Sequence, residues 1–149
     1  MKDKNRCGKV KAINTSETKG VVKNPVEEAY FRVNHGIEGD AHAGSWHRQV
    51  SLLATESADK VRAAGLDIDD GRFAENITTQ GIELYTLPVG TKLQIGGSVQ
   101  EVTQIGKECH TGCAIKQIVG DCVMPREGIF TKVLINGIVK PGDKIEVID

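Results

Sequence analysis

The chain has 149 residues, a formal net charge of −1 and a pI near 6.4. This length allows one domain with a hydrophobic core, and the near-neutral charge favours neither nucleic acid nor an anionic membrane as a partner. No stretch approaches the roughly 20 apolar residues of a membrane span, and the charged N-terminus lacks the apolar run of a secretory signal. We therefore expect a single cytoplasmic domain over residues 1–149, with reduced thiols.

Alternating apolar and polar residues predict strands at Lys9–Ile13 and Ala29–Val33. Between them, a polar turn at Asn14–Thr18 precedes another strand candidate at Lys19–Val22. A loop rich in Gly, His and Asp follows at Asn34–His47, and its polarity predicts that it lies outside the core.

Arg48–Leu53 is predicted to be a strand that leads into a helix. Thr55 is the candidate N-cap, and Gly65 fits a left-handed stop at the C-terminal end. The apolar stripe of this helix consists of Ala54, Ala58, Val61 and Ala64. Leu66–Arg72 has the acidic composition of a loop.

The second half of the chain contains a further set of short strands. They are predicted at Phe73–Thr79, Val99–Ile105, Ile129–Ile135 and in the near-repeat of Pro88–Ile95 and Lys140–Val147. A short helix is expected at Thr111–Val119, before Gly120. About eight short strands with one or two helices do not alternate as in a doubly wound sheet, so we predict a mostly β fold, a closed or partly closed β-barrel.

Three of the four cysteines fall near one another, and they allow three interpretations. Cys109, His110, Cys113 and Cys122 include the C-x₂₋₄-C half of a zinc site. Alternatively, Cys109 is a nucleophilic thiolate at a strand-to-helix junction, held anionic by Lys107, His110 and the helix dipole. Cys113 and Cys122 can also be small buried apolar residues. The composition around Cys109 favours a functional thiol there.

Three further motifs can form a binding site. Gly36–Arg48 combines glycines, whose backbone can approach a ligand closely, with Asp40, His42 and Arg48; the alternative is a connector in which Asp40 caps backbone amides and Trp46 plugs the barrel mouth. Glu75 and Asn76 interrupt an apolar run, as ligand-binding groups or as a clamp on the backbone. Arg126 can bind an oxyanion or form a surface pair with Glu127.

Together these segments resemble the MOSC domain, the C-terminal domain of molybdenum cofactor sulfurases. The matching segments run in order from Gly36–Asp40 with His42 and Gln49–Val50, through Phe73, Glu75–Thr78, Gly81–Ile82, Val89–Gly90 and Ile95–Gly96, to Val99–Ile105 with Cys109 and to Gly137 and Gly142–Asp143. The resemblance covers residues 9–148 and implies a strand-rich barrel in which Cys109 carries sulfur or meets the metal of a molybdopterin cofactor. The sequence departs from the family's pattern just before Cys109, where Lys107 would supply the positive charge.

The resemblance implies a stand-alone bacterial form that acts on molybdenum or tungsten cofactor, without the pyridoxal-phosphate desulfurase half. Cys109 would receive sulfane sulfur as a persulfide from a separate cysteine desulfurase, with His110 and Lys107 as helpers, and deliver it to cofactor destined for a molybdoenzyme. The expected cofactor-binding residues are Asp40, His42, Arg48, Glu75, Asn76 and Arg126. The alternatives are a module that binds the cofactor without sulfur chemistry, and a structural zinc or thiol-switch protein.

Overall fold

The computed structural model describes residues 7–17, 24–41, 43–63, 75–106 and 128–148. Within these ranges lie eleven strands, one α-helix and one 3₁₀ helix. The elements are β1 (Cys7–Thr15), β2 (Asn24–Val26), β3 (Ala29–Arg32), β4 (Gly36–Ile37), β5 (Val50–Ala54), α1 (Thr55–Ala63), β6 (Ile77–Gln80), η1 (Leu84–Thr86), β7 (Lys92–Ile95), β8 (Ser98–Ile105), β9 (Ile129–Ile135), β10 (Gly137–Val139) and β11 (Lys144–Ile148).

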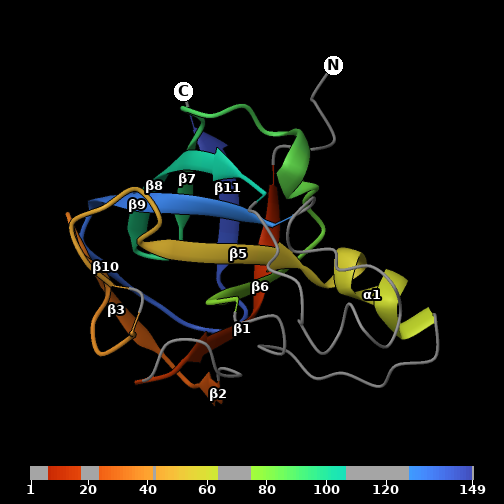
Figure 1. The fold of residues 1–149 in the computed structure, drawn as a ribbon, viewed down its shortest axis with the longest axis horizontal. Coiled ribbons are helices and arrows are strands. Elements are labelled where there is room, and N and C mark those ends of the chain that lie inside the picture. Colours follow the sequence, from red (N-terminus) through yellow and green to blue (C-terminus); the bar gives the residue numbers. More distant parts are fainter. Residues whose placement is uncertain (1–6, 18–23, 42, 64–74, 107–127, 149) are drawn as a thin grey trace, which may run out of the picture.

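Seven strands form a closed barrel, as Figure 1 shows. Their order is β11-β7-β8-β9-β5-β6-β1, and the pairing of β1 with β11 closes the ring. Neighbouring strands are antiparallel, except that β5 and β6 are parallel. Strand β2 extends β1, while β10, β3 and β4 form a separate small sheet. The predicted mostly β barrel is therefore confirmed.

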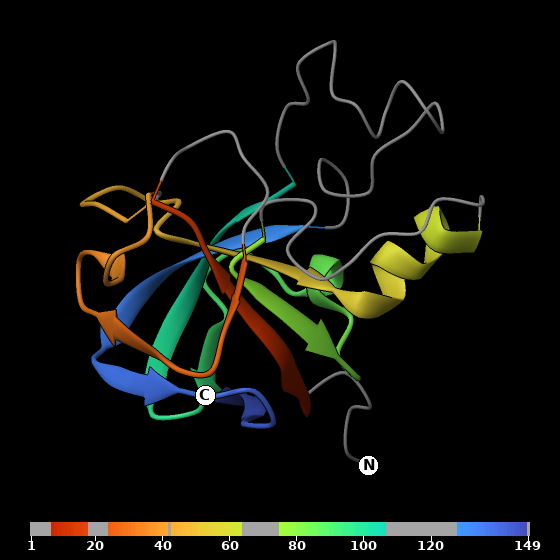
Figure 2. The same ribbon diagram turned by 90° about the horizontal axis from the view of Figure 1, so that it is seen from below.

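The small sheet and α1 lie on opposite sides of the barrel (Figures 1 and 2). Helix α1 begins at Thr55, directly after β5. Ala58 is buried as the predicted stripe requires, whereas Ala54, which was assigned to the same stripe, is a buried residue of β5. No helix in the described part of the chain is long and apolar enough to cross a membrane.

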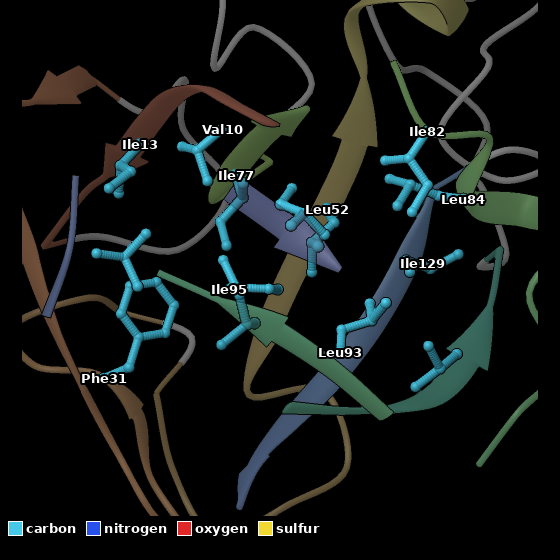
Figure 3. Packing of buried hydrophobic residues seen from close by; sticks show 14 of the residues in the cluster. Val10, Ile13, Phe31, Leu52, Ile77, Ile82, Leu84, Leu93, Ile95 and Ile129 are labelled. Atoms are coloured by element: carbon cyan, nitrogen blue, oxygen red, sulfur yellow. The ribbon is translucent and has the colours of Figure 1, made fainter. Parts of the chain in front are cut away.

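The barrel core consists of aliphatic side chains that alternate along the strands. In β7, for example, Leu93 and Ile95 are fully buried while Lys92 and Gln94 are exposed. Figure 3 shows these side chains meeting others from β1, β5, β6 and β9, with Phe31 of β3 at one side of the cluster. Burial of each large side chain contributes about 1.5–3 kcal/mol, so this interior is the main source of stability.

The near-repeat of the sequence has a simple structural explanation. Its two copies are the turns and strands that end in β7 and β11, and these strands pair with each other in antiparallel register, with Ile95 opposite Ile145. Both copies therefore place alternate apolar residues in the same core, next to the seam that closes the barrel.

Several boundaries differ from the sequence prediction, and three of them concern polar segments. Asn14 was assigned to a turn, but it is a fully buried residue of β1. Strand β6 begins at Ile77 rather than Phe73, so Glu75 and Asn76 precede it. The loop at 34–47, predicted to lie outside the core, contains β4, whose Ile37 is buried opposite Phe31. In each case pairing and burial in the tertiary structure override local composition.

Several sequence predictions lie outside the described residues. They concern the strand at Lys19–Val22, the helix at Thr111–Val119, the loop at Leu66–Arg72, and the helix-ending residues Ala64 and Gly65.

Gly137 tests how tightly the small sheet packs on the β7–β8 turn. A Cβ atom at Gly137 would collide with the backbone carbonyl of Gly97, which no side-chain rotation relieves. We expect Gly137→Ala to lower the free energy of unfolding by about 1–3 kcal/mol, measured by urea denaturation. Gly44→Ala is the matched control, because its Cβ would meet only the Trp46 ring, 3.8 Å away. Equal stability of the two variants would contradict the close packing.

Candidate functional site

The outer face of the barrel carries buried polar side chains where β1, β6 and β5 lie side by side. Leu52 and Ile77 are register partners that point into the core. Side chains alternate along a strand, so the preceding residues, Ser51 and Asn76, face outward. Both are nevertheless buried, with 7% and 0% of their surface exposed. Polar groups in such a place need hydrogen-bond partners.

Asn76 satisfies this need by binding the backbone of two neighbouring segments. Its Oδ1 accepts hydrogen bonds from the backbone N–H of Ser51 (3.0 Å) and from the Ser51 hydroxyl (3.2 Å). Its Nδ2 donates to the backbone carbonyl of Asn14 (3.2 Å). The hydrogen bonds on both edges of the amide thus match the clamp interpretation, and a direct contact between Asn76 and a cofactor stays a prediction.

Glu75 lies in the same buried network. Its Oε2 accepts a hydrogen bond from the Thr78 hydroxyl at 2.8 Å, and Asn14 Nδ2 donates both to the Glu75 carbonyl and to Thr78 Oγ1. The Oδ1 atom of Asn14 is buried and has no hydrogen-bond partner among the described residues. This face of the barrel therefore contains a buried acceptor, the Asn14 Oδ1 atom, to which none of the described donors is bound.

Asp40 holds the glycine-rich loop against the end of β1. Its Oδ1 accepts the Ser16 N–H at 3.1 Å, and the Ser16 carbonyl accepts the Ala41 N–H at 2.8 Å. Asp40 is only 6% exposed, so its carboxylate caps a backbone amide, as the connector interpretation requires. The same interpretation is wrong about Trp46, which is 41% exposed and does not plug the barrel mouth.

Arg48 belongs to a second polar cluster, at the end of β8. Its Nε donates to Gln104 Oε1 at 3.1 Å, and His47 Nε2 lies 2.8 Å from the same oxygen. The guanidinium carbon of Arg48 lies 5.3 Å from the centre of the Phe130 ring, a cation–π geometry. Arg48 is half-buried and His47 is exposed.

Gln104 connects this cluster to the strand end. Its Nε2 donates to the Gly106 carbonyl at 2.8 Å, and the Gly106 N–H donates to the Gly128 carbonyl at 2.6 Å. The described part of the barrel ends at Gly106 and resumes at Gly128, and these two residues are neighbours. Through Gln104 they are linked to Arg48.

The other predicted site residues lie outside the described part of the chain. These are Lys107, Cys109, His110 and Arg126, with His42 in the glycine-rich loop. Cys113 and Cys122 also lie outside it. Within the described residues no group of three or more His, Cys, Asp or Glu side chains could hold a metal ion. The cysteines of the zinc alternative lie outside the described residues, so that alternative stays open.

His47 and Gln104 were absent from the predicted site. His47 was visible in the sequence only as one of three histidines around the glycine-rich loop. Gln104 stands in a strand with no motif around it, and its direction depends on a register shift between Val102 and Gln104. Bulges of this kind re-aim side chains, and composition does not reveal them.

A separate hollow of about 420 Å³ lies between the β7–β8 turn and β11. It is lined by Gln94, Gly96, Gly97, Asp143, Lys144 and Glu146, none of which is a predicted site residue. A hydrogen bond and the charge of Glu146, 3.0 Å away, raise the pKa of Lys144. Both side chains of this surface ion pair are exposed, so it contributes little to stability.

The sequence profile of the MOSC domain matches residues 39–146, most of the chain, including Asp40, Arg48, Glu75, Asn76 and Gln104. The chain belongs to the MOSC domain family. This family is associated with the molybdenum cofactor, so the function of the chain is related to that cofactor at the family level. No curated protein sequence matches this MOSC protein.

Solved structures support the fold of this MOSC protein. The YuaD protein from Bacillus subtilis superposes with a TM-score of 0.79 at 20% identity, covering 95% of each chain. YiiM from Geobacillus stearothermophilus gives 0.71 at 17% identity, covering 95% of this chain and 75% of its own. YiiM from Escherichia coli gives 0.68 at 18% identity, with 96% and 70% covered. At these identities the likeness concerns the fold alone.

The Asn76 clamp can be tested by stability measurements. Asn76→Ala leaves the buried Ser51 N–H and Asn14 carbonyl without their side-chain partner, so we expect a loss of about 2–4 kcal/mol in the free energy of unfolding in urea. The matched control is Asn136→Ala, because Asn136 also accepts a backbone N–H, that of Val33, but is exposed. Its expected cost is below about 1 kcal/mol. Equal losses would contradict the clamp.

Proposed function

We propose that this MOSC protein receives sulfane sulfur on Cys109 and transfers it to a molybdenum or tungsten cofactor, which is its substrate. The proposal rests on the hydrogen-bonded series Arg48–Gln104–Gly106. This series joins a candidate anion-binding arginine to the strand end that precedes Cys109 in the sequence.

Arg48 is suited to bind the anionic part of such a substrate. Its Nε is engaged by Gln104 and its plane lies over Phe130, so its orientation is restricted. Within the described residues it forms no ion pair with a carboxylate. A half-buried guanidinium without an acidic partner favours binding of an external oxyanion such as a phosphate.

The sulfur-carrying thiol would be close to this arginine. Cys109 follows Gly106 by three residues, and three residues span at most about 11 Å. Gly106 accepts the hydrogen bond of Gln104, which in turn binds Arg48. The chain length therefore allows the thiol to reach a ligand held by Arg48.

The residues of the outer face fit a polar heterocycle. A pterin presents N–H donors, and the buried Asn14 Oδ1 atom is an acceptor to which no donor of the described residues is bound. Glu75 lies beside it, and Asp40 and Asn76 hold the surrounding backbone. We propose that Arg48 and Glu75 contact the substrate, together with His42 and Arg126, and that Asp40 and Asn76 shape the pocket through the backbone.

The chemistry requires a donor protein. The Cys109 thiolate attacks the outer sulfur of a persulfide on a separate cysteine desulfurase; a sulfur–sulfur bond forms on Cys109, and the donor thiolate leaves with the electron pair. His110 and Lys107 would favour the thiolate form of Cys109. The cofactor, as substrate, would then supply the electron pair that attacks the outer sulfur and would be oxidised by two electrons. A bond from the cofactor to sulfur would form, and the sulfur–sulfur bond would break with the Cys109 thiolate as the leaving group. A molybdoenzyme or a cofactor-biosynthesis protein would receive the product.

Sulfur loading is the direct test. After incubation with a cysteine desulfurase and cysteine, intact-mass analysis of the wild-type protein should show one added sulfur atom that reducing agent removes. Cys109→Ser should show none, because serine cannot form a persulfide. Cys7→Ser is the matched control, since Cys7 is an exposed thiol in β1, and it should load like the wild type.

Two results would overturn sulfur transfer. Equal loading of Cys109→Ser and wild type would mean that Cys109 is not the carrier. Binding of cofactor by wild-type protein that never acquires sulfur would favour the alternative, a module that binds the cofactor without sulfur chemistry.

Stoichiometric zinc that is lost with Cys113 or Cys122 substitutions would favour the structural metal site.

A further inference from the structure

The orientation of the Gln104 side chain follows from its partners. A carbonyl oxygen only accepts hydrogen bonds, so the amide group 2.8 Å from the Gly106 carbonyl is the NH₂ of Gln104. The Oε1 atom of Gln104 must then face His47 and Arg48. Reversing the amide would place its NH₂ group against the Arg48 Nε–H donor and its oxygen against the Gly106 carbonyl.

This orientation determines where the proton of His47 lies. Gln104 Oε1 is an acceptor, so the His47 Nε2 atom, 2.8 Å away, must carry a hydrogen. The neutral imidazole of His47 is therefore the Nε2–H tautomer, with its lone pair on Nδ1. Neutral histidine in water populates both tautomers, with Nε2–H the more abundant, so the hydrogen bond that His47 donates to Gln104 Oε1 selects this tautomer from that mixture.

The same oxygen positions Arg48 without neutralising it. Nε of Arg48 donates to Gln104 Oε1, while the ring of Phe130 supports the guanidinium plane. Since Gln104 is uncharged, the positive charge of Arg48 is retained. Both Nη atoms have no hydrogen bond to the described residues, and together they form the edge that binds two oxygens of one anion.

The backbone around Gln104 supports this arrangement. The register of β8 against β9 shifts between Val102 and Gln104, so Thr103 is the extra residue of a bulge. The Thr103 hydroxyl lies within hydrogen-bonding distance of the carbonyls of His47 and Phe130. Thr103 of the bulge therefore contacts the backbone of both His47 and Phe130, whose ring lies over Arg48. The next residue, Gln104, binds the side chains of His47 and Arg48.

We propose that Gln104 is a positioning residue for an oxyanion site at Arg48, and that it does so by selecting the Nε2–H tautomer of His47 and fixing the Nε edge of Arg48. The anion class is a phosphate or a carboxylate that accepts two parallel N–H bonds. The identification of this anion with part of the cofactor rests on the proposed function; the positioning role does not.

A glutamate at this position would act in the opposite way. Its carboxylate would repel the Gly106 carbonyl that now accepts from Gln104, and it would pair with Arg48 and cancel the charge offered to an anion. Gln104→Glu should therefore fold with Arg48 occupied and lose anion binding. Because glutamate and glutamine have nearly the same size, a loss of anion binding in Gln104→Glu would depend on the neutral amide and not on the volume of the side chain.

The test is a nuclear magnetic resonance titration of the full chain carrying Cys109→Ser, which removes sulfur chemistry. Long-range ¹H–¹⁵N spectra recorded in mildly alkaline buffer should show His47 as the Nε2–H tautomer. Inorganic phosphate, and separately acetate, should shift the Arg48 Nε–H resonance in a saturable way. Saturation by phosphate but not acetate would assign a phosphate site, and the reverse a carboxylate site.

Variants of Gln104 supply the decisive comparison. Gln104→Met keeps the side-chain length but removes both hydrogen-bonding groups; we expect a mixture of His47 tautomers and anion binding at least about tenfold weaker. Gln94→Met, on the exposed face of β7, is the matched control and should behave like the parent. Arg48→Ala should abolish the response.

Three outcomes would overturn the proposal: parental tautomer and affinity in Gln104→Met, saturable binding retained in Gln104→Glu, or no saturation by either anion in the parent protein. Because the titration uses protein that cannot carry sulfur on Cys109, these outcomes are independent of the sulfur-loading experiment. A normal titration with failed sulfur loading would leave the positioning role intact and reject the proposed transfer.

Discussion

Closure of the barrel between β1 and β11 is the constraint on which the rest of the structure depends. It joins the first and last described strands, so that seven strands share one aliphatic interior and the ring has no free edge. Because side chains alternate, filling the interior with Leu52, Ile77 and their neighbours forces the residues between them to the outer face. The polar networks of this protein are a consequence of that alternation.

The described polar residues form two networks with different tasks. Asn76 and Asp40 satisfy backbone groups, and their bonds tie β1 to β5, β6 and the glycine-rich loop. Arg48 and Gln104 bind one another at the end of β8, where the chain leaves and rejoins the barrel. The first network is rigid and buried, whereas the second presents a charged group. A binding site built in this way has a fixed support and an available cation.

Much of the fold was visible in the sequence because it follows from periodicity. The alternation in the near-repeat indicated which of its residues enter the core, and the pattern around Ala58 indicated helix α1. The boundaries that were wrong have a common cause. Asn14 and Asn76 are polar residues placed in buried, hydrogen-bonded positions, and a two-residue strand such as β4 is too short for any periodicity. Their partners come from segments distant in sequence, which local composition does not reveal.

The sequence by itself determined the family and which residue types are available for chemistry, since the motifs around Asp40, Glu75 and Asn76 are contiguous. Only the tertiary structure decided how these residues are used. The amide of Asn76 clamps the backbone because β5 and β1 lie on either side of it, and Gln104 reaches Arg48 because a bulge re-aims it across more than fifty residues of chain. Hydrogen bonds are short-ranged and directional, so their pairing is a property of the folded barrel rather than of any segment.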